Sequence, residues 1–226
     1  LNAELDRIGK STAFGKQNLL DGTFGATKST TGTAIAANGD KAAGIPTSLA
    51  GGFTFTLEKV GGSDKDPSGN SLAAGGTPPN GPITVTVGKL ADDATPQDLA
   101  RAVNEGLQSA LKQHGFQGTE VSMSAKVDSQ NNSTFKMSGA GDFSITNAGD
   151  LATAPAAADP TTGRNTGGLG MDMTTANLKD TGGNTGKFQV GANANQKIAI
   201  TIGGVDSETL GTAALDLTKD PDAAIK

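Results

Sequence analysis

His114 is the only histidine in the chain and the first residue to consider for acid–base chemistry. It follows Lys112 and Gln113 at the end of a helix-like segment, where the negative end of the helix dipole favours a histidine. A hydrolytic triad also needs a nucleophile and an orienting carboxylate, and no motif sets Ser or Asp beside His114. The sequence therefore predicts a solvated helix-end residue, and we expect no catalytic residues and no enzymatic activity.

Residues 64–75, DKDPSGNSLAAG, begin like a calcium-binding loop. Asp64, Asp66 and Ser68 occupy positions one, three and five, and a glycine follows at position six. Position twelve is Gly75, where such a loop requires a bidentate Glu. We therefore expect a polar turn, with no metal site and no cofactor.

The string GGLGMD at residues 167–172 is the densest glycine pattern with a possible link to phosphate binding. A phosphate-binding glycine loop follows a strand and opens a helix, and the neighbouring residues have neither pattern. We interpret this string as a linker.

The composition limits the size of any hydrophobic core. Of 226 residues 33 are Gly and 8 are Phe, with no Trp or Tyr, and the hydrophobic fraction is 35%. This length fits one large or two small domains, and two small domains with thin sheets and loops fit the composition better. The chain has no Cys, which excludes disulfides, thiolate metal sites and a Cys nucleophile.

The charge pattern argues against two classes of partner. The net charge is −5 and the acidic residues are scattered, so the chain has no basic stripe for nucleic acid and no polybasic patch for a membrane. No apolar run approaches the roughly 20 residues that span a bilayer. The N-terminal residues also lack the pattern of a cleavable signal peptide.

The clearest element is a helix over residues 95–115. Thr95 can act as its N-cap, Pro96 fits the first helical position, Asp98 completes a capping box, and Gly115 ends the helix. Apolar residues recur every four positions and predict one buried stripe against a sheet. The stripe consists of Leu99, Val103, Leu107 and Leu111, with Ala102 and Ala110 beside it. Gly106 should weaken the helix slightly.

Several segments alternate at period two and predict strands with one apolar face. They are residues 53–60, 82–90, 119–127, 133–139 and 142–146. Together with the helix they predict a small α+β module of strand, strand, helix, strand, strand type over residues 53–147. Residues 26–51 and 61–81 are rich in Gly, Thr, Ser, Asn, Ala and Pro and are predicted loops, and residues 152–168 form a predicted linker.

Both ends of the chain carry incomplete helix patterns. Leu1, Leu5 and Ile8 share one helical face with no N-cap residue before them, which is typical of the last turns of a longer helix. Thr218 and the Asp-Pro that follows are helix start signals, and that helix stops after about one turn. We expect helical arms that are missing from both ends.

The two ends resemble the flanks of the inner filament domain of bacterial flagellin. The resemblance rests on LNAELDRIGKSTAFGKQNLLDGTFG, with its NLLDG turn after an E-x-D-R-I helix end, and on KFQVGANANQKIAITIGGVDSETLG, with a hairpin at residues 188–202. It covers residues 1–25 and 186–226. The segment ATPQDLARAVNEGLQSA more weakly resembles a small repeat found inside flagellins and hook proteins.

The resemblance implies an α+β protein with an inner domain remnant, made of helix ends and a β-hairpin, and an inserted outer module. The inner domain is residues 1–25 and 186–226, and the exposed insertion is residues 26–185, with an ordered core at about 53–147. Packing or assembly in the inner domain would use ten apolar residues: Leu5, Ile8, Phe14, Leu19, Leu20, Phe188, Val190, Ile198, Ile200 and Ile202.

The family also implies a location and partners. A flagellin is an extracellular subunit of the flagellar filament that serves swimming motility, and it is exported without a cleavable signal peptide. Its partners are other flagellin subunits, an export chaperone, the filament cap and an innate immune receptor, whose main determinants lie in the missing arms. Exposed Thr and Ser carry O-linked sugars on some flagellins, but no specific residue follows from this sequence.

Two features depart from the family pattern. About 160 residues intervene before the FQVGAN hairpin, whereas the outer domains of flagellins usually follow it. The missing terminal arms would also make the chain unable to assemble by itself. The alternative is a secreted adhesin or a phage-tail-like binding module built from similar small α+β repeats.

Overall fold

The computed structural model describes residues 2–14, 17–22, 24–26, 28–37, 45–77, 79–91, 93–158, 165–174, 178–180, 187–189, 197–199, 202 and 204–213. Within these residues the chain combines a few helices with antiparallel sheets, as expected for the α+β class. The predicted strands and the helix of the central module are confirmed, with ends that differ by a few residues.

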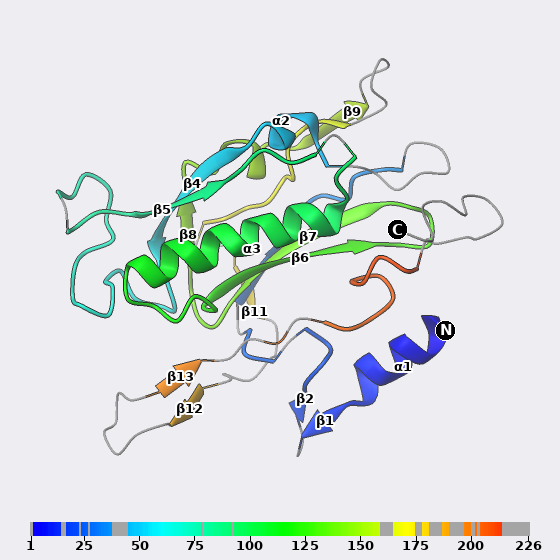
Figure 1. Ribbon diagram of the computed structural model, residues 1–226, viewed down its shortest axis with the longest axis horizontal. Helices are drawn as coiled ribbons and strands as arrows, with labels where there is room; N and C mark the ends of the chain where they lie inside the picture. The colour runs from blue at the N-terminus through cyan, green and yellow to red at the C-terminus, as the bar shows by residue number, and fades with distance from the viewer. Residues whose placement is uncertain are drawn as a thin grey trace.

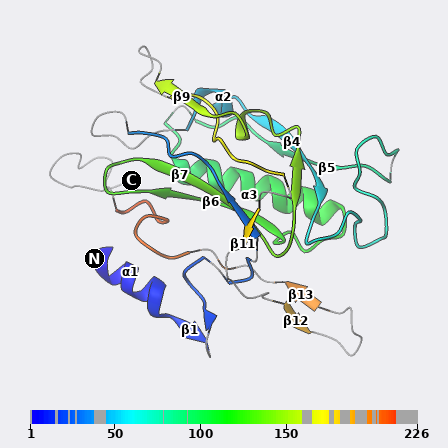
Figure 2. The same ribbon diagram turned by 180° about the vertical axis from the view of Figure 1, so that it is seen from behind.

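The larger sheet has the strand order β11-β3-β7-β6, and all its neighbours are antiparallel. Strands β6 (Val121–Val127) and β7 (Ser133–Gly139) form a long hairpin, and β3 (Lys28–Thr31) pairs with the other edge of β7. Strand β11 (Lys179–Asp180) completes the sheet beside β3. These two strands form the part of the sheet farthest from β6, and Figure 2 labels β11 there.

The smaller sheet has the order β5-β4-β8. Strand β4 (Phe53–Lys59) pairs along its length with β5 (Ile83–Val87) and, on its other edge, with β8 (Ser144–Thr146). Burial alternates strictly along β5, because its Ile and Val side chains face the core while its Thr side chains face outward. Both sheets therefore carry an apolar face, whereas the sequence predicts burial of the helix stripe against one sheet.

Helix α3 (Pro96–Gln113) packs against β5 of one sheet and β6 of the other, and it lies along the gap between the sheets (Figure 1). Its capping box is formed as predicted, since the Thr95 side chain accepts from the Asp98 backbone and the Asp98 carboxylate accepts from the Thr95 backbone. The predicted stripe is buried, with Leu99, Val103 and Leu107 at 0% exposure.

Gly106 lies where α3 comes closest to β5. A Cβ at this position would lie 2.7 Å from the backbone oxygen of Thr86 and 3.2 Å from Cγ1 of Val85. The expectation that this glycine only weakens the helix was therefore incomplete, because the close approach of helix to strand requires it.

The hydrophobic core draws on residues from Ile35 to Leu178, a wider range than the expected 53–147. Part of the predicted loop 26–51 is ordered as β3 and as α2 (Thr47–Ala50). The predicted linker 152–168 contains strands β9 (Pro155–Ala158) and β10 (Asn165–Gly167), which follow the short 3₁₀ turn η1 (Gly149–Leu151).

The string that we interpreted as a linker enters the same core. Leu169, Met171 and Met173 alternate with smaller residues and are at most 3% exposed. Their segment runs beside the edge strand β8, where Ile145 N donates to Met173 O. The apolar residues recur at every second position, the spacing that places them on one face of an extended chain.

The terminal segments lie to one side of this module (Figures 1 and 2). Helix α1 (Asn2–Ser11) is followed by the short hairpin β1 (Ala13–Phe14) and β2 (Gln17–Asn18). Strands β12 (Lys187–Gln189) and β13 (Lys197–Ala199) form the expected hairpin near the C-terminus. Leu1 and the expected helix start at residues 218–226 lie outside the described residues.

Candidate assembly surface on the paired flanks

The two flanks, residues 1–25 and 186–226, meet in space although about 180 to 210 residues separate their contacts in the sequence. Hydrogen bonds join their described parts. They run from Asn2 Nδ2 to Thr212 O (2.9 Å), from Ser207 N to Asp6 Oδ1 (2.8 Å), from Val205 N to Leu20 O (2.8 Å) and from Ile202 N to Phe24 O (3.1 Å). The flanks therefore form one continuous contact.

Glycines permit this contact at its closest points. Gly9 is the buried residue of α1, and a Cβ there would overlap the backbone oxygen of Val205. Gly22 has φ +77° and lies against Gly204, where a Cβ would come within 3.1 Å of the backbone nitrogen. The chain can turn at Gly22 and remain close to Gly204 because neither glycine has a side chain.

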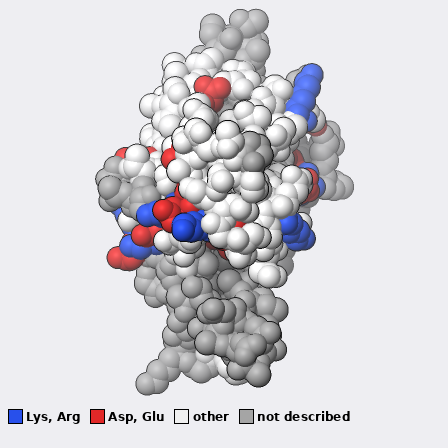
Figure 3. All heavy atoms as spheres, turned by 90° about the vertical axis from the view of Figure 1, so that its left-hand side faces the viewer, with Lys and Arg blue, Asp and Glu red and all other residues white. Residues whose placement is uncertain are grey.

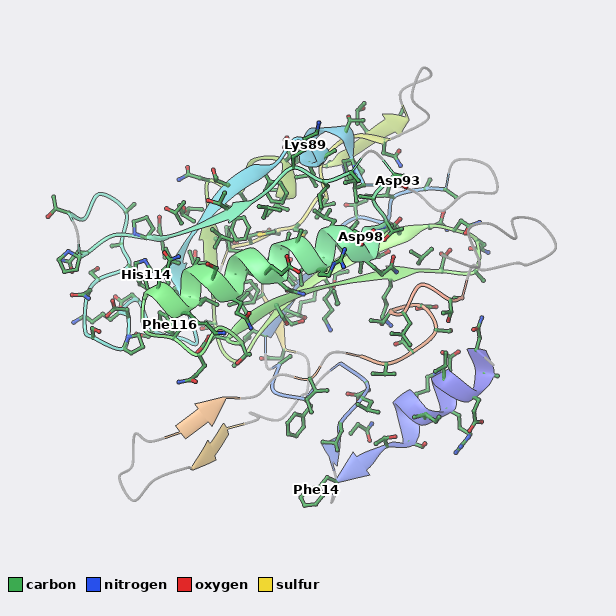
Figure 4. All side chains as sticks on the ribbon, viewed as in Figure 1. Phe14, Lys89, Asp93, Asp98, His114 and Phe116 are labelled. Atoms are coloured by element: carbon green, nitrogen blue, oxygen red, sulfur yellow. The ribbon has the colours of Figure 1, made fainter. Side chains whose placement is uncertain are left out.

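The flanks also carry the large apolar side chains that the described structure leaves exposed. Phe14 is 80% exposed, Leu210 is 48% exposed and Ile8 is 37% exposed. Figure 4 shows Phe14 pointing away from the rest of the molecule at the β1–β2 hairpin. Each belongs to a flank, whereas the large apolar residues of the module are gathered in its core.

The ten predicted assembly residues fall into four groups. Ile8 and Phe14 are exposed, and four are half-buried: Leu5, Leu19, Leu20 and Ile202. Phe188 on β12 and Ile198 on β13 are paired positions in the register of that hairpin. Val190 and Ile200 lie outside the described residues.

Leu210 was missed by the sequence reasoning. It lies in the segment SETLG, which has no apolar repeat and reads as a turn. In the structure it belongs to a turn whose amides fold back on Asp206 and Ser207, so that its side chain remains at the surface. The only local sequence pattern at this position is the pair Leu210–Gly211.

The carboxylates of this region are fixed by hydrogen bonds. Backbone and hydroxyl contacts from Ser207 hold the pKa of Asp6 below its usual range. For Asp206, burial raises the pKa, but hydrogen bonds from Thr209 and the nearby ammonium of Lys126 outweigh burial, so its pKa lies below the ordinary value. Both groups are therefore ionised at neutral pH and act as fixed negative charges.

The Asp66 carboxylate, considered above as a metal ligand, already accepts hydrogen bonds within its own turn. Asp66 and His114 both line a surface hollow of about 610 Å³. The Asp66 carboxylate already accepts from the backbone of Ser68 and from both the backbone and the amide of Asn70, which keeps its pKa below the usual range. This is the polar turn that the sequence predicts.

A second turn repeats this arrangement at the end of the β6–β7 hairpin. The Asp128 carboxylate accepts from the backbone of Gln130 and from the backbone and amide of Asn132. The shared Asp-x-x-x-Asn spacing shows that these carboxylates stabilise turns by satisfying backbone donors.

The face shown in Figure 3 has a mixed charge. In the view of Figure 3, acidic and basic side chains lie next to each other and much of the remaining described surface is uncharged. Of the described helices, none combines the length and apolarity that crossing a bilayer requires.

Comparison with known proteins gives no assignment. No protein-family model matches the chain, and neither a search of curated proteins nor a search of solved structures finds a match.

Proposed function

We propose that this chain is a structural subunit of the bacterial flagellar filament. The single observation that carries the proposal is the location of the exposed apolar residues Ile8, Phe14 and Leu210 on the paired flanks. An aromatic side chain that is 80% exposed leaves apolar area in contact with water, which a neighbouring molecule can cover. The resemblance to flagellin rests on these same flanks.

The proposal assigns different tasks to the two parts of the chain. The flanks would contact neighbouring subunits in a helical homopolymer, and residues 26–185 would form the exposed filament surface. The hydrophobic core of the module is closed by its own chain, and Thr54, Thr84 and Thr86 face outward from its smaller sheet. A module of this kind stays folded and solvated whether or not neighbours are present.

The proposed location is extracellular, as part of a filament that serves swimming motility. The partners would be further subunits, with the export chaperone and the filament cap that the family uses. The alternative of a secreted adhesin or phage-tail-like module would instead place the binding surface on residues 26–185, so the two proposals differ in which surface matters.

A chimaera tests the proposal directly. Residues 1–226 would be inserted between the terminal helices of a flagellin that forms filaments, and the product would be examined by negative-stain electron microscopy under polymerising conditions. We expect helical filaments. In Phe14→Ser we expect filaments to be shorter or absent, because the exposed aromatic contact is lost.

Thr54→Ser is the matched control, since Thr54 is exposed on the module and should not affect assembly. A chimaera that folds but stays monomeric by light scattering would sink the proposal. Equal assembly of Phe14→Ser and Thr54→Ser would show that the assembly surface has been misplaced.

A further inference from the structure

The C-terminal turn, residues 204–213, lies between the N-terminal flank and the module. Toward the N-terminal flank it contacts α1 and the segment after β2 through the hydrogen bonds of Asn2, Asp6 and Leu20. Toward the module it contacts β6 and the first turn of α3. This turn is therefore the place where the terminal segments meet the module.

The contacts with β6 are ionic and polar. Lys126 Nζ lies 3.0 Å from Asp206 Oδ2 and 3.6 Å from Glu208 Oε2. Val127 N donates to the backbone oxygen of Glu208 at 3.1 Å. The Lys126 side chain is 47% exposed, so dissolved ions can reach this ion pair and weaken it.

A cavity of about 190 Å³ lies beside these contacts, lined by residues of both the sheet and the flanks. The sheet contributes Ser124, Lys126 and Lys136 to this lining, and the flanks contribute Asp21, Gly204 and Thr209. Burial and the neighbouring charge of Lys126 lower the pKa of Lys136. Lys126 and Lys136 of the sheet and Asp21 of the N-terminal flank therefore line the same cavity.

A buried donor at the same junction is unsatisfied. Gln97 Nε2 has no hydrogen-bond partner among the described residues, and its amide lies against Gly211, where a Cβ would come within 2.9 Å of this atom. An unsatisfied buried donor destabilises the closed arrangement. Separation of the turn from α3 would let water reach this amide and would remove that cost.

We propose that the C-terminal turn is a releasable latch, held on the module by the ion pairs of Lys126, and that the module swings away from the flanks when those ion pairs are screened or removed. The clustered apolar residues of the module come from residues 35–178, so opening the junction leaves that hydrophobic core intact. This inference does not depend on filament assembly.

Spin labels can measure this movement because the chain contains no cysteine. Ala3→Cys on α1 and Ser109→Cys on α3 give an exposed pair, one on each side of the junction. Pulsed electron–electron double resonance between the two spin labels should give a narrow distance distribution at low salt. In about 1 M NaCl, where the Debye length is about 3 Å, it should become broader and longer.

Lys126→Gln should show the broad distribution already at low salt and should no longer respond to salt. Ion pairs at this exposure correspond to about a twofold to fivefold change in the ratio of closed to open molecules. Lys89→Gln is the control, because it removes the same charge from an exposed loop of the module (Figure 4), and it should behave like the unmodified chain.

A distribution in Lys126→Gln that matches the unmodified chain overturns the proposal, as does an unmodified chain that does not respond to salt. If Lys126→Gln fails to fold by circular dichroism, the double variant Asp206→Asn with Glu208→Gln removes the same ion pairs from the other side. A distance distribution in the double variant that matches the unmodified chain then overturns the proposal, as does an unmodified chain that does not respond to salt.

Discussion

The side-chain amide of Asn104 binds both backbone polar groups of Met123. Asn104 Nδ2 donates to Met123 O at 2.8 Å, and Met123 N donates to Asn104 Oδ1 at 2.6 Å. Strand β6 is the edge of its sheet, so these groups point away from β7 and would otherwise be open to another strand. One residue of α3 therefore takes the place of a neighbouring strand at the centre of this edge.

We expect Asn104→Leu to lower the free energy of unfolding by about 1 to 3 kcal/mol, because it leaves the Met123 donor and acceptor without their partner. Urea unfolding followed by circular dichroism measures the loss. The variant should also aggregate more readily, since an unpaired edge can bind another chain. Gln113→Leu, at an exposed position of the same helix, should retain the original stability.

Gly106→Ala tests the close contact between α3 and β5. Alanine favours a helix over glycine by about 1 kcal/mol, but its Cβ would lie 2.7 Å from the Thr86 backbone oxygen. We expect overpacking to prevail, with a net loss of about 1 to 2 kcal/mol in urea unfolding. Gly51→Ala is the comparison, because nothing lies within 4 Å of its Cβ and it should be neutral or stabilising. Stabilisation by Gly106→Ala would contradict the packing argument.

Gly9→Ala tests the contact between the flanks. Its Cβ would overlap the Val205 backbone oxygen and push the C-terminal turn away from α1. Hydrogen exchange at the amides of Val205 and Ser207 should accelerate by about tenfold to a hundredfold, since each 1.4 kcal/mol corresponds to a factor of ten. Exchange in the β6–β7 hairpin should stay constant. Slow exchange of Val205 in the variant would argue against this contact.

Acid should destabilise the module through three aspartates. Hydrogen bonds to Asp66, Asp98 and Asp128 hold their pKa values below the ordinary range. A lowered pKa in the folded state contributes stability that is complete above the unfolded value of about 3.9. That stability is lost as the pH falls through the folded value.

The urea midpoint should therefore be level around neutral pH and decline below about pH 4. Asp128→Asn should decline less steeply, because one of the three lowered pKa values is gone. A midpoint that rises on acidification would contradict the sign of these shifts.

The central module was largely predictable because its patterns are local. Thr95, Pro96 and Asp98 specify the start of α3, and the period-two runs specify β4 to β7. Strand β3 was missed because Lys-Ser-Thr-Thr has no apolar alternation, and its conformation depends on the free edge of β7. Strand pairing of this kind depends on distant residues, which a local pattern does not contain.

The candidate site was predictable only in part. Ile8 and Phe14 were identified through the flank resemblance, and both are exposed. Leu210, Lys126 and Asp206 were not identified, because their contacts join residues far apart in the sequence. The Leu169, Met171 and Met173 run did carry a usable signal in its alternation, which the many neighbouring glycines obscured.

The pairing of β3 with β11 brings the two ends of the segment 28–180 together. Lys28 begins the module and Asp180 ends its last strand, and the two residues are cross-strand partners with an ion pair at 2.8 Å. The chain thus enters and leaves the module at one point. A gene encoding the flanks could therefore gain, lose or exchange this whole segment as a cassette, and a tight turn could join the flanks where the segment is lost. Each exchange would place a different module on unchanged flanks.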